Sequence, residues 1–391
     1  MKRFSAQYII TNAGPPLKRA IITAGDDGTI VDIEDTMGDL QERGSVEFYN
    51  GIIIPGFVNC HCHLELSHMK DSVSQGTGLA DFIEQVRRTR ATDNDNIISA
   101  AKCSDHDMYA AGINLCADIC NTSLTFNIKK ESRISYFNLI EVFGIDPVKA
   151  GHRMAEIINI SEIAGEMNLP FAVVPHSVYS LSLTLFRLLR EASNDNRVTS
   201  IHFMESEGEA DLVERHSGPL MTSYKKSGLI SSGIETVKSH ADAVLNEITS
   251  SGNLILVHNT FAGRTIIRTV ETRGNLYWCL CPSSNSYIEN KLPPADILVD
   301  EGCTIVIGTD SLASNKKLDI LEELKTLQLN FPFLSIEELV LWATANGAKA
   351  LGEQEQFGTI EAGKRPGLLL LQNADLQNMK LLPESSVTRL I

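Results

Sequence analysis

The stretch GIIIPGFVNCHCHLELSH, residues 51–68, decides what fold we expect of this chain. An apolar run, Ile52–Ile54, meets a break at Pro55–Gly56 and then continues, which predicts an interrupted strand. His61 and His63 lie at the end of this strand, and the alternation of side chains with period two places both on the same side. At ~3.3 Å per residue the two imidazoles lie about 7 Å apart along the strand and can bind one metal ion. The alternative is two incidental polar residues where a strand meets a loop, and the rest of the chain decides between these interpretations.

Composition limits the functions that the chain can have. Its 391 residues are 43% hydrophobic and 21% charged, which supports a sizeable core and argues against disorder. A net charge of −15 repels phosphate backbones and excludes nucleic acid as a partner. No apolar run approaches the ~18 residues of a membrane span, and no signal-peptide core follows the N-terminus. Eight cysteines, mostly in apolar runs, are typical of reduced thiols in a cytoplasmic protein.

Both ends of the chain are predicted to consist of short strands. In residues 1–55, Ala20–Thr23 and Thr29–Ile33 flank Asp26–Gly28, which predicts a hairpin. Near the C-terminus, Gly358–Gly363 and Gly367–Leu371 are also predicted to be short strands. We therefore expect the two ends to build one small β domain around a larger middle.

The middle of the chain alternates strands and helices. The predicted strands after the one that carries His61 are Ile113–Ile119, Ile134–Val142, Phe171–Pro175, Thr199–Met204, Leu254–Val257, Leu276–Leu280 and Thr304–Ile307. The predicted helices are Leu79–Arg90, Asn96–Gly112, Met154–Met167, Leu183–Ala192, Ala241–Gly252 and Ile336–Leu351. Eight strand–helix units predict an α/β fold, the (β/α)₈ TIM barrel, whose chemistry lies at the carboxyl ends of its strands.

Polar residues whose side chains can bind a metal or take part in catalysis follow most of these strands. The residues at the strand ends are His61, His63, His176, His202, Glu205, His258, Asn285 and Asp310. Singly, each has a structural explanation, such as a core histidine at His202 or a helix N-cap at Asp310. Together on one rim they favour a functional site. The other histidines are expected to be plain surface residues: His68, His106, His152, His216 and His240.

These residue types suit metal-assisted hydrolysis. Three imidazoles and one carboxylate can bind Zn²⁺ or Fe²⁺ and leave one position for water. The metal lowers the pKa of that water to about 7, so that hydroxide can attack an sp² carbon. Glu205, three residues after His202, can move protons from the water to a ring nitrogen and the leaving group. His258 can polarise the attacked centre or help to position the hydroxide, and His176 and Asn285 are candidate substrate contacts.

An ordered set of motifs resembles the amidohydrolase superfamily, in its mononuclear-metal deaminase and chlorohydrolase branch. The matching motifs are Pro55–His63, His176–Ser177, His202-x-x-Glu205, His258–Asn259, Cys281-Pro282-x-Ser284-Asn285, Gly308–Ser311, Thr344–Gly352 and Gly358–Lys364. The resemblance implies a barrel over residues 56–352, and a β-sandwich built from residues 1–55 and 353–391. The sequence departs from many relatives at Gly363–Gly367, in the expected sandwich.

The resemblance also implies roles for individual residues. The expected metal ligands are His61, His63, His202 and Asp310, with catalysis by Glu205 and His258. His176 stands where binuclear relatives carry a bridging lysine, so one divalent ion is expected, most simply Zn²⁺, with Fe²⁺ as the alternative. The expected substrate contacts are His176, Asn285, Glu65 and Ser311.

The same resemblance implies an aminohydrolase that deaminates an amino-substituted heterocycle, such as a purine, a nucleoside or a pterin. Residues 63–67 resemble the aminofutalosine deaminases, and the wider set resembles methylthioadenosine/S-adenosylhomocysteine and guanine deaminases. Glu65, Asp81, Glu84 and Glu141 are candidates for binding ribose hydroxyls or an amino group, or are surface and supporting residues. One alternative is an amidohydrolase or chlorohydrolase acting on another C–N or C–Cl bond. Another is a non-catalytic metal-binding barrel. A small-molecule substrate and a homodimer complete these expectations.

Overall fold

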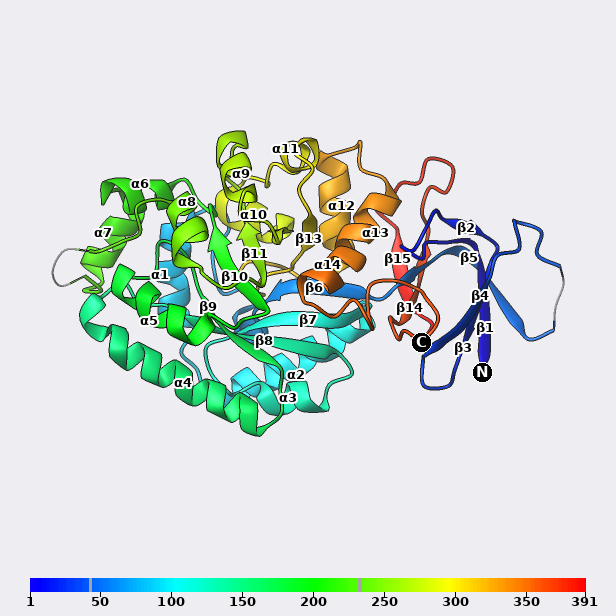
Figure 1. The fold of residues 1–391 in the computed structure, drawn as a ribbon, viewed down its shortest axis with the longest axis horizontal. Coiled ribbons are helices and arrows are strands. Elements are labelled where there is room, and N and C mark those ends of the chain that lie inside the picture. Colours follow the sequence, from blue (N-terminus) through cyan, green and yellow to red (C-terminus); the bar gives the residue numbers. More distant parts are fainter. Residues whose placement is uncertain (42–43, 231–233) are drawn as a thin grey trace.

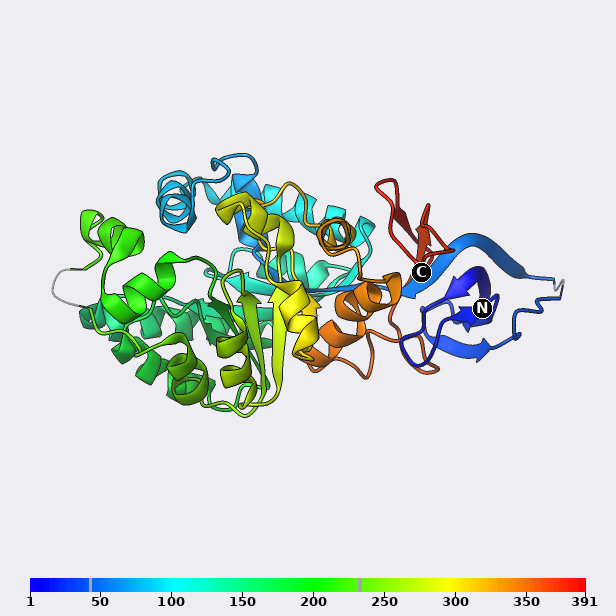
Figure 2. The ribbon, with the colours of Figure 1, turned by 90° about the horizontal axis from the view of Figure 1, so that it is seen from above.

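The computed structural model describes residues 1–41, 44–230 and 234–391. Parallel strands occupy the middle of the larger part of the molecule, and helices surround them (Figure 1). A β-sheet stands at one end, and both termini lie there (Figure 1). Viewed from above, the same sheet is clearly set apart from the helical part (Figure 2).

Both ends of the chain contribute to this terminal sheet, as expected. Its strands are β1 (Lys2–Ile9), β2 (Leu17–Lys18), β3 (Ile21–Ala24), β4 (Ile30–Glu34), β5 (Val46–Pro55), β14 (Leu368–Gln372) and β15 (Ser386–Arg389). They form one seven-stranded sheet in the order β15-β14-β5-β1-β3-β4, with β2 beside β1. Strand β5 joins the two halves because its length lets it pair with both β1 and β14. The predicted hairpin is confirmed as β3 and β4, with Gly28 in the left-handed region at φ +83°.

One predicted strand of this unit is wrong. Gly358–Gly363 is not a strand, although its backbone bonds to the sheet: the Ile360 amide donates to Thr11 O and the Gly363 amide donates to Ile30 O. These two bonds are widely spaced and reach different parts of the chain, the loop after β1 and the start of β4, so they hold the segment without the repeating ladder of a strand.

The eight predicted strands of the middle are all present and parallel. They form one sheet of β6 (Phe57–Cys62), β7 (Ile113–Cys120), β8 (Ser135–Val142) and β9 (Phe171–Pro175), and another of β10 (Val198–Phe203), β11 (Asn253–His258), β12 (Leu276–Leu280) and β13 (Ile305–Ile307). Single parallel bridges link the edges of the two sheets, Ser177 to His202 and Cys62 to Asp310. The break between β5 and β6 falls at Pro55–Gly56, as the sequence predicts.

Side chains along these strands are buried on both faces, which explains their nearly continuous apolar character. On β11, Leu254 and Leu256 pack in the core beneath the helices, while Ile255 and Val257 pack in a second, inner cluster. The period-two alternation of a strand therefore separates two cores. The inner cluster fills the space between the strands and gives a firm base to the residues at their carboxyl ends.

The larger helices are α1 (Leu79–Thr89), α2 (Asn94–Ala110), α4 (Ala150–Glu166), α5 (Leu183–Ser193), α6 (Gly208–Arg215), α7 (Gly218–Lys226), α9 (Arg264–Glu271), α10 (Pro282–Glu289), α12 (Ile320–Asn330) and α13 (Ile336–Ala343). Shorter helical segments are η1 (Leu64–Met69), α3 (Phe126–Glu131), η2 (Pro147–Lys149), α8 (His240–Asp242), η3 (Ala243–Glu247), α11 (Ala295–Asp300) and α14 (Ala345–Ala350). In the described part of the chain, no helix has the length and apolar character needed to cross a membrane.

Two predicted helices are wrong in their extent. The expected helix Ile336–Leu351 is divided into α13 and α14, because Thr344 leaves the helical region at φ −137°, ψ −83°. The Thr344 hydroxyl is engaged with Val340 O and with the Asn12 side chain, which ties this break to the terminal sheet. The expected helix Ala241–Gly252 ends at Glu247, after one short α-helical turn and a π-helical segment.

Candidate functional site

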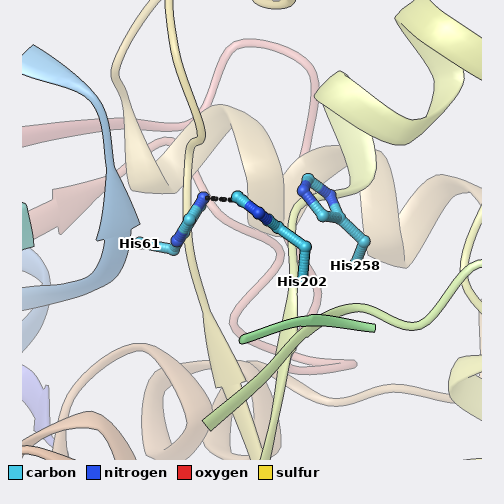
Figure 3. A group of neighbouring side chains, drawn as sticks. All are labelled: His61, His202 and His258. Carbon is cyan, nitrogen blue, oxygen red and sulfur yellow. Dashed lines mark hydrogen bonds between the residues drawn. The ribbon is translucent and has the colours of Figure 1, made fainter. Parts of the chain in front are cut away.

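Three histidine rings meet at the carboxyl ends of the strands. His61 Nε2 lies 3.1 Å from His63 Nε2 and 3.1 Å from His202 Nε2. His61 and His63 leave the end of β6, and His202 comes from β10. All three are buried. Figure 3 shows His61 and His202 pointing toward one another, with His258 beside them.

The ring nitrogens and nearby carboxylates form three groups of potential metal ligands. These groups are His61–His63–Asp310, His61–His202–His258 and Glu141–His176–His202. The four predicted ligands thus fall in the first two groups, which share His61. Imidazole nitrogens with a carboxylate oxygen are the ligands that Zn²⁺ prefers.

The protonation states also fit a cation at this place. Burial lowers the pKa of His63 and of His202 well below the usual range, and the neighbouring imidazoles lower both further. Neutral rings can offer their nitrogens to a metal, whereas protonated rings cannot. The buried Nδ1 atoms of His61 and His202 have no hydrogen-bond partner within the described chain. The residues therefore fit a divalent metal.

Asp310 is held with one oxygen free to face the histidines. Its Oδ2 accepts hydrogen bonds from the Ser284 and Ser314 hydroxyls at 2.6 and 2.7 Å. Its Oδ1 lies 3.6 Å from His61 Nε2 and 3.4 Å from His63 Nε2. Burial alone would raise the pKa of Asp310, but His61 and the other imidazoles hold it well below the usual range. The carboxylate is therefore ionised and available as a ligand.

Glu205 lies beside the cluster at the end of β10. Its Oε1 is 3.7 Å from His258 Nε2, and its Oε2 accepts a hydrogen bond from the Tyr179 hydroxyl at 3.1 Å. Burial raises the pKa of Glu205 well above the usual range, and the charges of Glu209 and Asp310 raise it further. A buried carboxyl group with a raised pKa is suited to taking and giving protons near neutral pH.

The turn after β11 places His258. The backbone of His258 has φ +76° and that of Asn259 has φ +61°, so the strand geometry ends there in a costly conformation. The Asn285 amide nitrogen lies 3.2 Å from His258 Nδ1 and 2.6 Å from the Thr260 hydroxyl. Burial lowers the pKa of His258 to about 3. A neutral His258 that accepts a bond from Asn285 at Nδ1 carries its proton on Nε2, toward Glu205.

A cavity of about 700 Å³ opens in front of this cluster, a volume in the range of small-molecule sites. Its polar end is lined by His63, His176, His202, Glu205, His258, Asp310 and Ser311. Helix α1 gives it an apolar wall of Leu79, Phe82, Ile83 and Val86. The predicted contacts His176 and Ser311 thus face the cavity. The His176 ring is held through Nδ1 by Ser177 and Ser180, each at 2.9 Å.

Two predicted substrate contacts stand behind the cavity surface. The Glu65 carboxylate is buried and accepts hydrogen bonds from the Asn121 amide at 2.5 Å and the Thr122 hydroxyl at 2.7 Å. Asn121 and Thr122 line the cavity, so Glu65 supports part of its wall. Asn285 is likewise buried and supports His258.

The remaining acidic candidates differ in position. Glu141 lines the cavity, 3.9 Å from His202 Nδ1, and burial raises its pKa to about 7. Asp81 is exposed, and Glu84 lies 3.9 Å from Lys226. Tyr179, which contacts Glu205, carries no sequence signal because tyrosine is common in ordinary cores.

The prediction that five histidines are plain surface residues is wrong for two of them. His240 is buried and lies 3.0 Å from Glu209. His68 is half-buried, with its ring nitrogens on the backbone oxygens of Glu65 and Arg90. Neither follows a strand, so their positions depend on how the helical segments pack.

Known proteins resemble this chain over most of its length. An adenosine deaminase of Helicobacter pylori is 26% identical over 330 residues, which cover 82% of this chain and 79% of that protein. The crystal structure of an aminofutalosine deaminase of Helicobacter pylori in complex with methylthio-coformycin matches with a TM-score of 0.80 at 22% identity, over 96% of this chain and 93% of that one. An atrazine chlorohydrolase of Arthrobacter aurescens TC1, crystallised with zinc, matches with a TM-score of 0.72 at 19% identity, over 96% and 88% of the two chains.

The structural likenesses show a shared fold of TIM-barrel type. This chain carries a cluster of histidine and aspartate side chains that could hold a metal ion, and the chlorohydrolase structure is complexed with zinc. The model of one family matches residues 52–387, which include every strand from β6 to β14 and all the residues of the cluster. The chain belongs to the amidohydrolase family.

Proposed function

We propose that this chain is a metal-dependent aminohydrolase, which releases ammonia from an amino-substituted heterocycle of the purine nucleoside type. The observation that carries the proposal is the placement of Glu205, buried at the polar end of the cavity between His258 and Tyr179. A group of metal-ligating side chains alone would be compatible with many functions. A buried carboxyl group with a raised pKa beside it supports proton transfer.

His61, His63, His202 and Asp310 are the residues that would hold one divalent ion, with Zn²⁺ the simplest choice for three imidazoles and a carboxylate. Such an ion supplies a water molecule of lowered pKa at neutral pH. One ion fits best because Asp310 offers a single free oxygen and His176 is tied to two serine hydroxyls. The third possible group, which includes Glu141, shares His202 with the main cluster.

Glu205 takes one proton of the attacking water and delivers it to a ring nitrogen of the substrate, and it then carries the second proton, from the hydroxyl group added to the ring, to the departing amine. His258 donates from Nε2 to the oxygen that develops charge. Asn285 fixes the tautomer and the direction of that ring, through the contact at Nδ1. Of the two protons that Glu205 moves, one stays on the ring nitrogen and one leaves with the amino group as ammonia, and a carbonyl group remains on the ring.

The cavity wall supports a substrate larger than a free base. His176 and Ser311 are placed to contact a heterocycle at the polar end, and the apolar face of α1 is placed to cover its substituent. The matched relatives include an adenosine deaminase and an aminofutalosine deaminase, which is why a nucleoside is the first choice. Glu65 acts through Asn121 and Thr122 rather than by direct contact.

We also infer that the two four-stranded sheets form one closed eight-stranded barrel, since bridges join both pairs of edges. We infer that residues 1–55 and 353–391 together form one terminal β unit, which is built on a single seven-stranded sheet where two packed sheets were expected. Eight free cysteines, most of them buried, support a reducing compartment such as the cytoplasm.

An ammonia-release screen tests the function. Adenosine, 5′-substituted adenosines, guanine and a pterin are offered to the zinc-loaded enzyme, with Glu205→Gln as the control. We expect turnover of at least one adenosine-type nucleoside and its loss in the control. Failure on every amine with turnover of a cyclic amide or a chlorinated triazine would replace deamination with one of those reactions. Failure on all of them would favour the non-catalytic alternative.

A further inference from the structure

A buried acid–histidine pair lies next to Glu205, outside the residues assigned to the reaction. Glu209, on α6, has no exposed surface, and His240, on α8, is 3% exposed. Glu209 Oε2 accepts a hydrogen bond from His240 Nε2 at 3.0 Å. Burial of a carboxylate and an imidazole is costly unless both are well bonded, so this pair needs an explanation.

The other oxygen of Glu209 binds the backbone of the catalytic segment. Oε1 accepts from the amide of Glu205 at 2.6 Å and from the amide of Ser206 at 3.0 Å. Glu209 therefore uses both of its oxygens, one on His240 and one on two successive amides. Hydrogen bonds to an ionised acceptor are among the stronger ones in proteins.

The segment that Glu209 holds is strained. Met204, between β10 and Glu205, has φ +48°, in the left-handed region that a residue with a side chain rarely adopts. The backbone on the other side is tied to the chain that follows β11, because the Phe261 amide donates to Met204 O at 2.9 Å. The bonds to Glu209 on one side of Met204 and the bond from Phe261 on the other fix the direction of the backbone after β10. This direction points the Glu205 side chain toward His258.

His240 in turn fixes Glu209. Its ring packs edge-on against Phe203, the last residue of β10, with ring centroids 5.6 Å apart. The first turn of α8 is capped by the Ser239 hydroxyl, which accepts from the Asp242 amide. The position of His240 is thus fixed by α8 and by β10, and His240 in turn helps to fix the backbone that follows β10.

We propose that Glu209 and His240 are positioning residues, which hold the Glu205 carboxylate in reach of its proton donors and acceptors. The role rests on the proposed function of Glu205 as proton shuttle. Neither residue lines the cavity among the residues that the structure describes, so both act through Glu205 rather than on the substrate.

Steady-state kinetics on the zinc-loaded enzyme test this role. We expect Glu209→Ala and His240→Ala to lower kcat by about 10–100-fold, the range seen when outer partners of a site are removed. KM and metal content should stay as in the wild type. His240→Gln should recover much of the loss, because its amide can donate where Nε2–H did. Asp105→Ala is the matched control and should not change kcat. Asp105 lies on α2, does not line the cavity, and accepts hydrogen bonds from the Ser132 and Tyr136 hydroxyls.

A double variant separates positioning from a general loss of structure. If Glu209 works through Glu205, then Glu205→Gln and the double variant Glu205→Gln/Glu209→Ala should share the same residual kcat. A further fall in the double variant would overturn the proposal, as would unchanged kcat in both alanine variants. If Glu209→Ala does not fold, the His240→Ala and His240→Gln pair decides.

Hydrogen exchange tests the same contact without activity. Exchange of the Glu205 and Ser206 amides should accelerate in Glu209→Ala and His240→Ala, and should not change in Asp105→Ala. Unchanged protection of these amides would overturn the proposal even if kcat falls. If the wild type releases no ammonia from any amine, the proposed function fails, while the exchange result still shows whether the pair holds this segment.

Discussion

Glu205 Oε1 and His258 Nε2 lie 3.7 Å apart at the ends of two neighbouring strands, and both side chains are buried. Burial acts on them in opposite directions: it raises the pKa of Glu205 and lowers that of His258 to about 3. The two groups therefore face the cavity with complementary abilities, one able to take a proton and the other to donate a hydrogen bond without charge.

Glu205→Gln should lower kcat by about 10²–10⁴-fold, the range of general acid–base catalysis, and by more if one carboxyl group serves both proton transfers. The fold and the metal should be retained because the change keeps the shape and removes no ligand. Substrate binding, measured by calorimetry, should persist. Turnover close to that of the wild type would remove Glu205 from the mechanism, and loss of metal would make it a ligand.

Asn285→Leu should lower kcat with little effect on metal content. The substitution removes the contact at His258 Nδ1 but keeps the number and branching of the side-chain heavy atoms, so the ring loses its fixed tautomer. We expect a loss of about 10-fold or more, as for other outer partners. Kinetics with parallel elemental analysis measures it, and a variant with normal kcat would show that the ring is fixed by packing alone.

His63→Ala should remove most of the metal and nearly all activity, because it deletes one of four ligands and opens the cavity end of the cluster. Elemental analysis of the wild type should give one divalent ion per chain. His152→Ala, at an exposed position on α4, is the control and should keep its metal. Two ions per wild-type chain would contradict the single-metal assignment.

Lys129→Met should destabilise the fold by about 3–5 kcal/mol, the cost of breaking a buried ion pair. Lys129 and Asp118 are paired and almost fully buried, and Asp118 Oδ1 accepts from the amide of Leu64 at 2.7 Å, directly after His63. Burial alone would lower the pKa of Lys129, but Asp118 and Cys120 raise it, so the lysine is charged. Urea denaturation measures the loss. Lys129→Met/Asp118→Leu should recover part of it, because no unpaired charge remains.

Glu323→Gln should flatten the dependence of stability on pH. Burial raises the pKa of Glu323 from 4.5 to about 8 in the folded state. The folded state therefore holds this proton more tightly than the unfolded state, and the stabilisation is complete below pH 4.5 and lost as the pH rises through about 8. The free energy of unfolding of the wild type should fall more between about pH 5 and about pH 9 than that of the variant. Equal slopes would show that Glu323 is ionised throughout.

The sequence alone determined which residues end the strands. Local patterns were sufficient for this, since apolar runs, turn residues and the period of two are properties of neighbouring positions. All eight strands, the hairpin of β3 and β4 and the break at Pro55–Gly56 were predicted in this way. Because parallel strands end at one edge, the convergence of His61, His202 and Asp310 also followed from the pattern.

Only the tertiary structure decided how these residues are supported. Glu65 and Asn285 look like cavity residues by position, but their contacts with Asn121 and His258 place them behind the surface. The burial of His240 against Glu209 depends on how α6 packs against α8, which no local pattern specifies. Such contacts join residues far apart in the chain through side-chain directions that no local period specifies. The positive φ angles at Met204 and His258, which aim the two catalytic candidates, are likewise imposed by the surrounding fold.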